Sequence, residues 1–135
     1  MAYSTKIKNI YDQLDIILKD LPGSVSHGDF TGNEGIMVSN ITSSIIDRMA
    51  GSNTRRYSVD LSVFYRASGT YDQVTTMLSR RLDKLEYTLD QASSRTVSGT
   101  YYWHDGEVVS SEISENDDDE LIGLISYELS ITEVA

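Results

Sequence analysis

The stretch RRYSVDLSVFYR, residues 55–66, decides the fold class more than any other part of the chain. Apolar residues alternate with residues that are mostly polar, and this two-residue period predicts a β-strand with one buried face. Such a strand suits an antiparallel sheet whose second side meets solvent or a partner. The apolar set is Tyr57, Val59, Leu61, Val63 and Tyr65, and the other set is Ser58, Asp60, Ser62, Phe64 and Arg66.

Two helices are predicted, one before this strand and one after it. Residues 4–20 carry apolar side chains at the i, i+3, i+4 and i+7 positions of one buried helix face, and Pro22-Gly23 ends the helix. A second helix begins at a capping box formed by Thr70 and Gln73 and runs to about residue 90. Its predicted buried stripe consists of Val74, Met77, Leu78, Leu82, Leu85 and Leu89.

The segment between the first helix and the central strand divides into loop, strand and turn. Residues 22–34 are rich in Gly, Ser, Asp and Asn, and they are predicted to form a loop. Residues 35–41 are predicted to form a strand. Residues 39–50 fit either one helix face or a strand, and we favour the strand. A turn is predicted at 51–53, where Gly, Ser and Asn follow one another.

The C-terminal part is predicted to form a hairpin and a closing strand. Residues 99–104 favour a strand, and Asp105-Gly106 is a strong hairpin-turn signal, so 107–113 are expected to return as its partner. Residues 116–120 are predicted to form a solvated loop, because a sheet interior would leave their adjacent polar groups unsatisfied. Residues 121–132 are predicted to form the last strand.

These elements predict a single α+β domain over residues 1–135. The economical packing is a mainly antiparallel β-sheet with two amphipathic helices packed on one face, plus a C-terminal β-hairpin. A chain of 135 residues is long enough to close one hydrophobic core of this kind.

The acidic charge is concentrated at the C-terminal end of the chain. The 11 Lys and Arg residues and the 21 Asp and Glu residues give a net charge of −10. Residues 1–95 hold all 11 bases and 11 acids, whereas residues 96–135 hold the remaining 10 acids and no base. Such a surface repels a phosphate backbone, so tight DNA binding is not expected, although DNA can still slide past it.

Composition excludes several classes of site. The chain has no cysteine, which rules out disulfides, thiolate metal sites and cysteine nucleophiles and fits synthesis in a reducing cytoplasm. No apolar run reaches the ~20 residues that a membrane helix needs. The first residues lack the apolar core of a secretory signal. We therefore expect no contact with a membrane.

No catalytic, cofactor-binding or metal site is expected, and the chain is not expected to be an enzyme. The two histidines, His27 and His104, lie in a Gly-rich loop and at the predicted hairpin turn, outside any nucleophile-elbow pattern. The glycines of 28–35 follow no predicted strand and lack the Lys-Ser/Thr of a phosphate-binding loop. The acidic run 116–120 has neither the alternate spacing nor the central Gly of an EF-hand.

Two groups of side chains are candidates for contacts with other molecules. The basic group is either a solvated surface or an inter-subunit surface that meets an acidic face of a neighbouring copy in a head-to-tail ring. The aromatic group is expected to pack within the hairpin, and a protein interface is the alternative. The basic group is Arg55, Arg56, Arg80, Arg81 and Lys84, and the aromatic group is Tyr101, Tyr102 and Trp103.

Two segments resemble a family of phage proteins. RRYSVDLSVFYR (55–66), followed by a capped helix, and EISENDDDELIGLISYELSITEV (112–134), an acidic loop followed by a strand, are similar to the tail terminator or minor capsid proteins of long-tailed phages. The resemblance covers nearly the whole chain. It rests on the order of the elements, since the family has no invariant catalytic motif, and it assigns a function to no single residue.

The resemblance implies a structural role at the head–tail junction of a virion, after assembly in the host cytoplasm. Tail terminators form a hexameric ring that caps the tail tube, docks to the neck and passes DNA through its lumen. The implied partners are further copies of the chain, the tail tube protein, a head-completion or neck protein, and genomic DNA that passes without specific binding. The acidic loop, formed by Glu115, Asp117, Asp118, Asp119 and Glu120, is expected to line or rim the lumen.

Two alternatives stay open. The chain could be another neck protein, such as a head-completion or stopper subunit, which binds the portal side and not the tail tube. It could also be a soluble, non-enzymatic adaptor domain that binds one charged partner and forms no ring.

Overall fold

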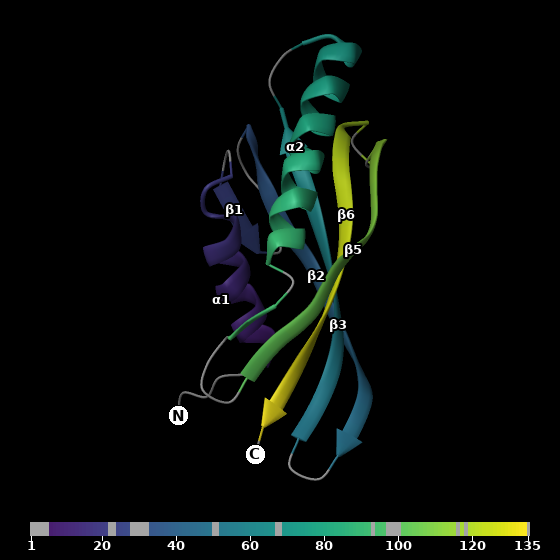
Figure 1. Ribbon diagram of the computed structural model, residues 1–135. Helices are drawn as coiled ribbons and strands as arrows, with labels where there is room; N and C mark the ends of the chain where they lie inside the picture. Colours follow the sequence, from purple (N-terminus) through teal and green to yellow (C-terminus); the bar gives the residue numbers. More distant parts are fainter. Residues whose placement is uncertain are drawn as a thin grey trace.

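The computed structural model describes residues 6–21, 24–27, 33–49, 52–66, 69–92, 94–96, 101–115, 117 and 119–134. These residues form two helices and six strands, so the chain has the α+β fold that its sequence predicts (Figure 1). The helices are α1 (Lys6–Leu18) and α2 (Tyr71–Gln91). The strands are β1 (Ser24–His27), β2 (Glu34–Met49), β3 (Ser52–Tyr65), β4 (Arg95–Thr96), β5 (Tyr101–Glu115) and β6 (Leu121–Val134).

The six strands of the described part form one mixed sheet in the order β1-β2-β3-β6-β5-β4. Every neighbouring pair is antiparallel except β1 and β2, which run parallel. The long strands β2, β3, β6 and β5 therefore form a continuous antiparallel ladder. The short strands cover little of it, since β1 pairs with Gly35–Val38 of β2 and β4 pairs with Tyr102 and Trp103 of β5.

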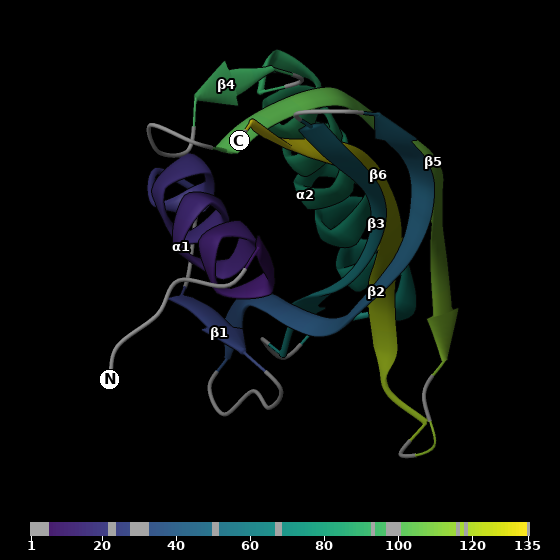
Figure 2. The ribbon, with the colours of Figure 1, turned by 90° about the horizontal axis from the view of Figure 1, so that it is seen from below.

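The central strand β3 has the buried face that its alternating sequence predicts. Tyr57, Val59, Leu61 and Val63 are all buried in the hydrophobic core. α2 contacts β3, β5 and β6, and the long strands curve around it (Figure 2). We call the face of the sheet in contact with α2 the inner face and the opposite one the outer face. Phe64, which alternates onto the outer face, is also buried.

α2 begins at the predicted capping box and packs through a stripe of leucines. The side chain of Thr70 accepts from the backbone N–H of Gln73 at 3.2 Å, and Gln73 accepts from the backbone N–H of Thr70 at 2.9 Å. The leucine stripe, which faces the sheet, consists of Leu78, Leu82, Leu85 and Leu89, all buried. Gly123 of β6 lies so close that a Cβ there would stand 2.9 Å from Leu82. The helix therefore approaches β6 where β6 has no side chain.

α1 adds a second set of buried side chains to the same core. It contacts α2 and β1, and its fully buried residues are Ile10, Leu14 and Leu18. The side-chain Nδ2 of Asn9 and Oε1 of Gln13 are also buried, with no hydrogen-bond partner in the described structure. Each such group destabilises the fold by about 1–3 kcal/mol. α1 ends at Leu18, and the predicted stop at Pro22-Gly23 lies outside the described residues.

Two predictions for the N-terminal half are wrong in part, and one is confirmed. Residues 24–27, predicted as loop, form β1, because a partner strand stabilises a segment too short and polar to show a strand period. The turn predicted at 51–53 is wrong at Ser52 and Asn53, which already pair with β2. The favoured strand over the ambiguous residues 39–50 is confirmed, since β2 runs to Met49.

The hairpin turn predicted at Asp105-Gly106 is wrong. β5 continues to Glu115 and pairs with β6, so residues 107–113 do not fold back on 99–104. Asp105 has a φ of 54° and, with Gly106, forms a bulge between His104 and Glu107. An Asp-Gly pair adopts positive φ as readily in a bulge as in a hairpin turn, so the dipeptide alone does not distinguish the two.

The close contact of α2 with Gly123 predicts a specific destabilisation. Gly123→Ala should lower the free energy of unfolding by about 1–3 kcal/mol, because the new methyl group meets Leu82. Urea unfolding measures this. In a Leu82→Ala background, which itself should cost about 2–5 kcal/mol, the glycine substitution should cost much less. An equal cost of Gly123→Ala in both backgrounds would contradict this packing.

Candidate functional site

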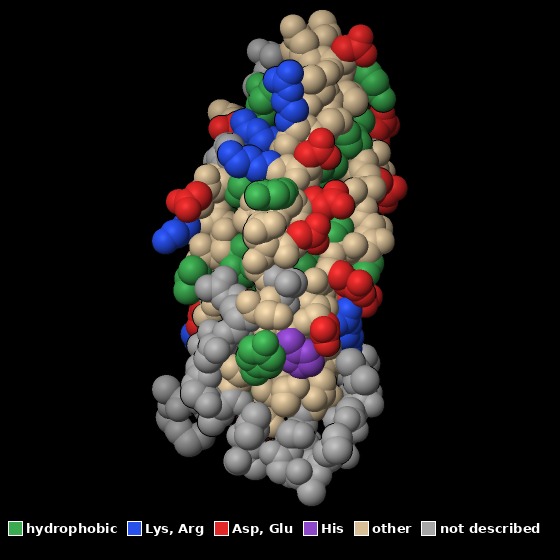
Figure 3. Space-filling model, in the orientation of Figure 1, with side chains coloured by type: hydrophobic (Ala, Val, Ile, Leu, Met, Phe, Trp, Pro, Cys, Tyr) green, Lys and Arg blue, Asp and Glu red, His purple; other side chains and the backbone are tan. Residues whose placement is uncertain are grey.

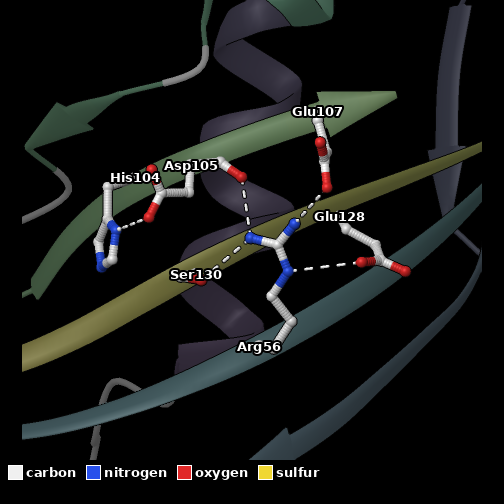
Figure 4. Close-up of polar contacts among 6 residues, drawn as sticks. All are labelled: Arg56, His104, Asp105, Glu107, Glu128 and Ser130. Carbon is white, nitrogen blue, oxygen red and sulfur yellow. Dashed lines mark hydrogen bonds and ion pairs between the residues drawn. The ribbon is translucent and has the colours of Figure 1, made fainter. Parts of the chain in front are cut away.

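A polar network with Arg56 at its centre crosses the outer face of the sheet (Figure 4). Arg56 lies on β3 next to the buried Tyr57, so its side chain projects from the opposite face. Its partners come from β5 and β6, and the side chain of Arg56 is only 20% exposed. The network therefore joins three strands that are distant in sequence.

The guanidinium of Arg56 donates from all three of its nitrogens. Nη2 pairs with Glu107 at 3.0 Å, and Nε pairs with Glu128 at 3.4 Å. Nη1 donates to the carbonyl oxygen of Asp105 at 2.8 Å and to the hydroxyl of Ser130 at 3.0 Å. Charge-assisted bonds of this kind are the strong ones in proteins. Arg56 therefore holds the β5 bulge against β3 across β6.

A second chain of contacts runs through His104 beside this arginine. Nδ1 of His104 lies 2.9 Å from a carboxylate oxygen of Asp105, and Nε2 lies 2.8 Å from the hydroxyl of Thr132. That hydroxyl lies 2.8 Å from the hydroxyl of Thr54 on β3. The order carboxylate, imidazole, hydroxyl is that of a hydrolytic triad.

The surroundings of Thr132 favour a structural role for this chain of contacts. The Thr132 hydroxyl is shared between His104 and Thr54, so it already has two partners across the sheet. Asp105 is exposed and is the immediate chain neighbour of His104, so it does not hold the ring from a buried position. A triad also needs donors that stabilise an oxyanion, and the contacts of these residues supply none in the described structure.

The sequence did not predict this network. Its members lie on three strands, and their meeting depends on the register of β3, β6 and β5 and on the bulge after His104. The one usable signal is the Asp105-Gly106 pair, which marks a departure from regular strand geometry. A hairpin turn at this pair would fold 107–113 back on 99–104, whereas the bulge lets β5 continue along β6 and places Asp105 and Glu107 beside Arg56.

The acidic loop connects β5 and β6, and three of its residues are exposed. Glu115, Asp117 and Asp119 lie at the surface, and Asp119 has a φ of 57°. Glu120 is tied down, since its carboxylate lies 2.6 Å from Nε and 3.2 Å from Nη2 of Arg66. Asp118 lies outside the described residues. The Arg66 pair thus fixes the base of the loop next to the end of β3.

The basic group predicted from the sequence does not form one cluster. Arg56 is on the outer face, whereas Arg81 lies on α2 and pairs with Glu34 at 3.0 Å. Arg55 donates to the hydroxyl of Ser43 at 3.3 Å. Arg80 and Lys84 are exposed on α2. The five side chains therefore lie on different parts of the molecule: Arg56 on the outer face of the sheet, Arg55 beside β2, and the other three on α2.

The three aromatic residues have three different environments. Trp103 is completely buried and packs against Tyr127, with ring centroids 6.1 Å apart, so it belongs to the core and not to an interface. Tyr102 is 45% exposed and stacks on His104. Tyr101 is half-buried, and burial raises the pKa of its hydroxyl. A hydrogen bond to Glu133 and the negative charge of that carboxylate raise the pKa further.

Among the described residues, no three His, Asp or Glu side chains come together in a group that could hold a metal ion. Neither helix found there is long and apolar enough to cross a membrane. The sequence matches no protein-family profile and no curated protein.

Removing the central arginine should destabilise the fold. Arg56→Ala should lower the free energy of unfolding by about 1–2 kcal/mol, because the buried Ser130 hydroxyl and the carbonyl of Asp105 lose their donor, whereas the exposed carboxylates of Glu107 and Glu128 lose only a solvent-screened partner. Arg80→Ala, at an exposed position on α2, is the matched control and should change it by less than about 0.5 kcal/mol. Similar effects of the two substitutions, measured by urea unfolding, would contradict the network.

The buried tyrosines predict a loss of stability at high pH. The pKa of Tyr57 is raised mainly by burial, against a lowering by Arg55, and the pKa of Tyr101 is raised as described. A tyrosine whose pKa is higher in the folded than in the unfolded chain makes its full contribution to stability below the ordinary value of about 10. That contribution is lost as the pH rises through the pKa of the folded state. Tyr101→Phe should reduce the fall in unfolding free energy between about pH 9 and pH 11.

Tyr87→Phe serves as the control for this pH effect, since Tyr87 is 66% exposed on α2. It should leave the pH dependence of unfolding unchanged. The account of Tyr101 fails if both substitutions alter the alkaline loss of stability to the same extent.

Proposed function

We propose that the chain is a structural virion subunit, a tail terminator that caps the tail tube of a long-tailed phage as a hexameric ring at the head–tail junction. Each subunit then carries both helices on the inner face of its sheet, and β5 and β6 form its C-terminal hairpin. DNA passes through the lumen of the ring, and the subunit catalyses no reaction. Six copies and the place in the virion follow from the family resemblance.

The position of the surplus acids is the observation that carries this proposal. All ten follow Arg95 in the sequence, and they fall on β5, β6 and the connection between these strands. In Figure 3, Asp and Glu side chains lie mainly along the β5 side of the molecule. Lys and Arg side chains gather on the other flank of α2. Opposite charge on opposite flanks favours head-to-tail association, the kind of contact from which rings are built.

The exposed acids of the acidic loop support passage of DNA. Glu115, Asp117 and Asp119 present negative charge with no Lys or Arg in the same part of the sequence. A lumen or rim of this sign repels phosphate, so a moving genome is not trapped there. Arg66, which holds Glu120, keeps the loop at a fixed place beside the end of β3.

Tail tube capping tests the proposal directly. Tail tube protein is polymerised with and without the purified chain, and tube lengths are measured by negative-stain electron microscopy. The proposal predicts shorter tubes, each ending in a six-fold ring. Unchanged tube growth contradicts it. Binding to the portal side of a connector complex would then favour a stopper, and binding to neither would favour an adaptor domain.

A further inference from the structure

The antiparallel ladder ends on two strands whose outer edges are mostly open. Among the described strands, β1 covers only Gly35–Val38 of β2, and β4 covers only the start of β5. Where no described strand pairs with these edges, their backbone N–H and C=O groups are a template for another strand. Most described side chains along them are exposed, including Thr42 and Ser43 on β2 and Ser111 and Glu112 on β5.

Each open edge contains one regular segment of six residues. Register shifts interrupt β2 between Val38 and Asn40 and again between Ile45 and Asp47, which leaves residues 40–45 undistorted. A shift between Val108 and Ser110 leaves residues 110–115 of β5 undistorted. We call these the β2 edge segment and the β5 edge segment. Irregular pairing bounds the β2 edge segment on both sides, and a bulge and the end of β5 at Glu115 bound the β5 edge segment, so an added strand is confined to these segments.

The directions of the two edge strands suit each other. β2, β3, β6 and β5 alternate in direction along the ladder, so β2 and β5 of one chain run antiparallel. A second copy placed beside the first with its strands in the same orientation brings its β2 antiparallel to β5. The ladder then continues across the junction, and each copy keeps one open edge for the next. This is a heterologous contact, which generates a ring when the rotation between neighbouring copies closes.

The faces of the two segments fix the register. Ile41 pairs with Val59, and Ile113 pairs with Gly123, so both isoleucines lie on the inner face and pack against the core. Directly opposite residues of a sheet share a face. Placing Ile113 opposite Ile41 of the next copy also sets Glu112 opposite Thr42, both exposed on the outer face. Shifting by one residue would put each isoleucine opposite a residue of the other face.

This register tilts the strands by an amount that suits closure. Ile41 lies level with Tyr127 of β6, whereas Ile113 lies level with Gly123, which is four residues earlier in that strand. An offset of ~13 Å for each four strands, which are ~19 Å wide, corresponds to a tilt of about 35°. Closed sheets have strand tilts of about 35–45°.

Charge selects this pairing over a symmetric one. Pairing β5 with β5 of another copy would gather Glu112 and Glu115 of both chains at one junction, and residues 96–135 contain no Lys or Arg to balance them. Like charges on facing strands are destabilising. The β2 edge segment, Asn40 to Ile45, carries no charge, and it is bordered by Arg55, whose side chain reaches Ser43.

From these observations we propose that copies of the chain join head to tail by strand pairing, with the β5 edge segment of one copy against the β2 edge segment of the next. The partner is a second copy of this chain, and Ile113 lies opposite Ile41. This inference rests on the proposed function for a closed ring, and it names the two surfaces that close it.

Engineered cysteines test this pairing, because the chain has none of its own. Ser43→Cys and Ser111→Cys lie opposite each other in the proposed register, on one face. Each single variant, and their mixture, is treated with a short bis-maleimide at high protein concentration. The mixture should give a covalent dimer that neither variant gives alone. A chain that carries both substitutions should give a ladder of covalent multimers.

Glu112→Cys mixed with Ser43→Cys is the register control, since these positions face opposite sides of the sheet. It should give at least fivefold less dimer than the Ser111 pair. The pairing is overturned if the mixture gives no dimer, if Ser111→Cys links to itself equally well, or if the control links equally well. Tube capping by the unmodified chain is measured separately. Capping without cross-linking would overturn the pairing and leave the proposed function standing. Cross-linking without capping would support the pairing and contradict the proposed function.

Discussion

The leucine stripe of α2 packs on the inner face of β3, β5 and β6, and the rest of the structure depends on this contact. It buries four leucines against the side chains of these strands that face the core, among them Tyr57, Val59 and Leu61 of β3. Gly123 lets the helix approach β6 closely. Because the period of a strand is two, burying one face fixes the register of every long strand and sends the polar set to the other side. The polar outer face, with the Arg56 network on it, is therefore a consequence of which face of the strands packs against α2.

The outer face shows how a polar sheet surface is kept ordered without a covering helix. Arg56 joins β3 to β5 and β6, and His104 with Thr132 and Thr54 adds a second tie across the same strands. These contacts form beside the bulge after His104, where the regular pairing of β5 with β6 is interrupted. The most enzyme-like arrangement in the described structure is therefore explained by the need to hold strands together.

The sequence predicted those parts of the fold that depend on local pattern. The alternation of 55–66 gave β3, and Thr70 with Gln73 gave the start of α2, because both signals act within a few residues. It failed where partners decide the outcome: β1 is a strand only beside β2, and Asp105-Gly106 is a bulge only because β6 pairs on both sides of it. Three residues of the acidic loop, Glu115, Asp117 and Asp119, are exposed, as the polar run 116–120 predicts. The burial of Trp103 and the separation of the basic residues depend on which strands pair, so no local pattern predicts them.

The proposed ring needs two complementary surfaces on each subunit, and we propose that the two edge segments are these surfaces. Hydrogen exchange of the unassembled and the assembled chain tests this account most directly. The account predicts that backbone amides in residues 40–45 and 110–115 become protected on assembly, while those of α2 keep their exchange rates. Protection that appears on α2 or on the outer face, with both edge segments unchanged, would contradict it.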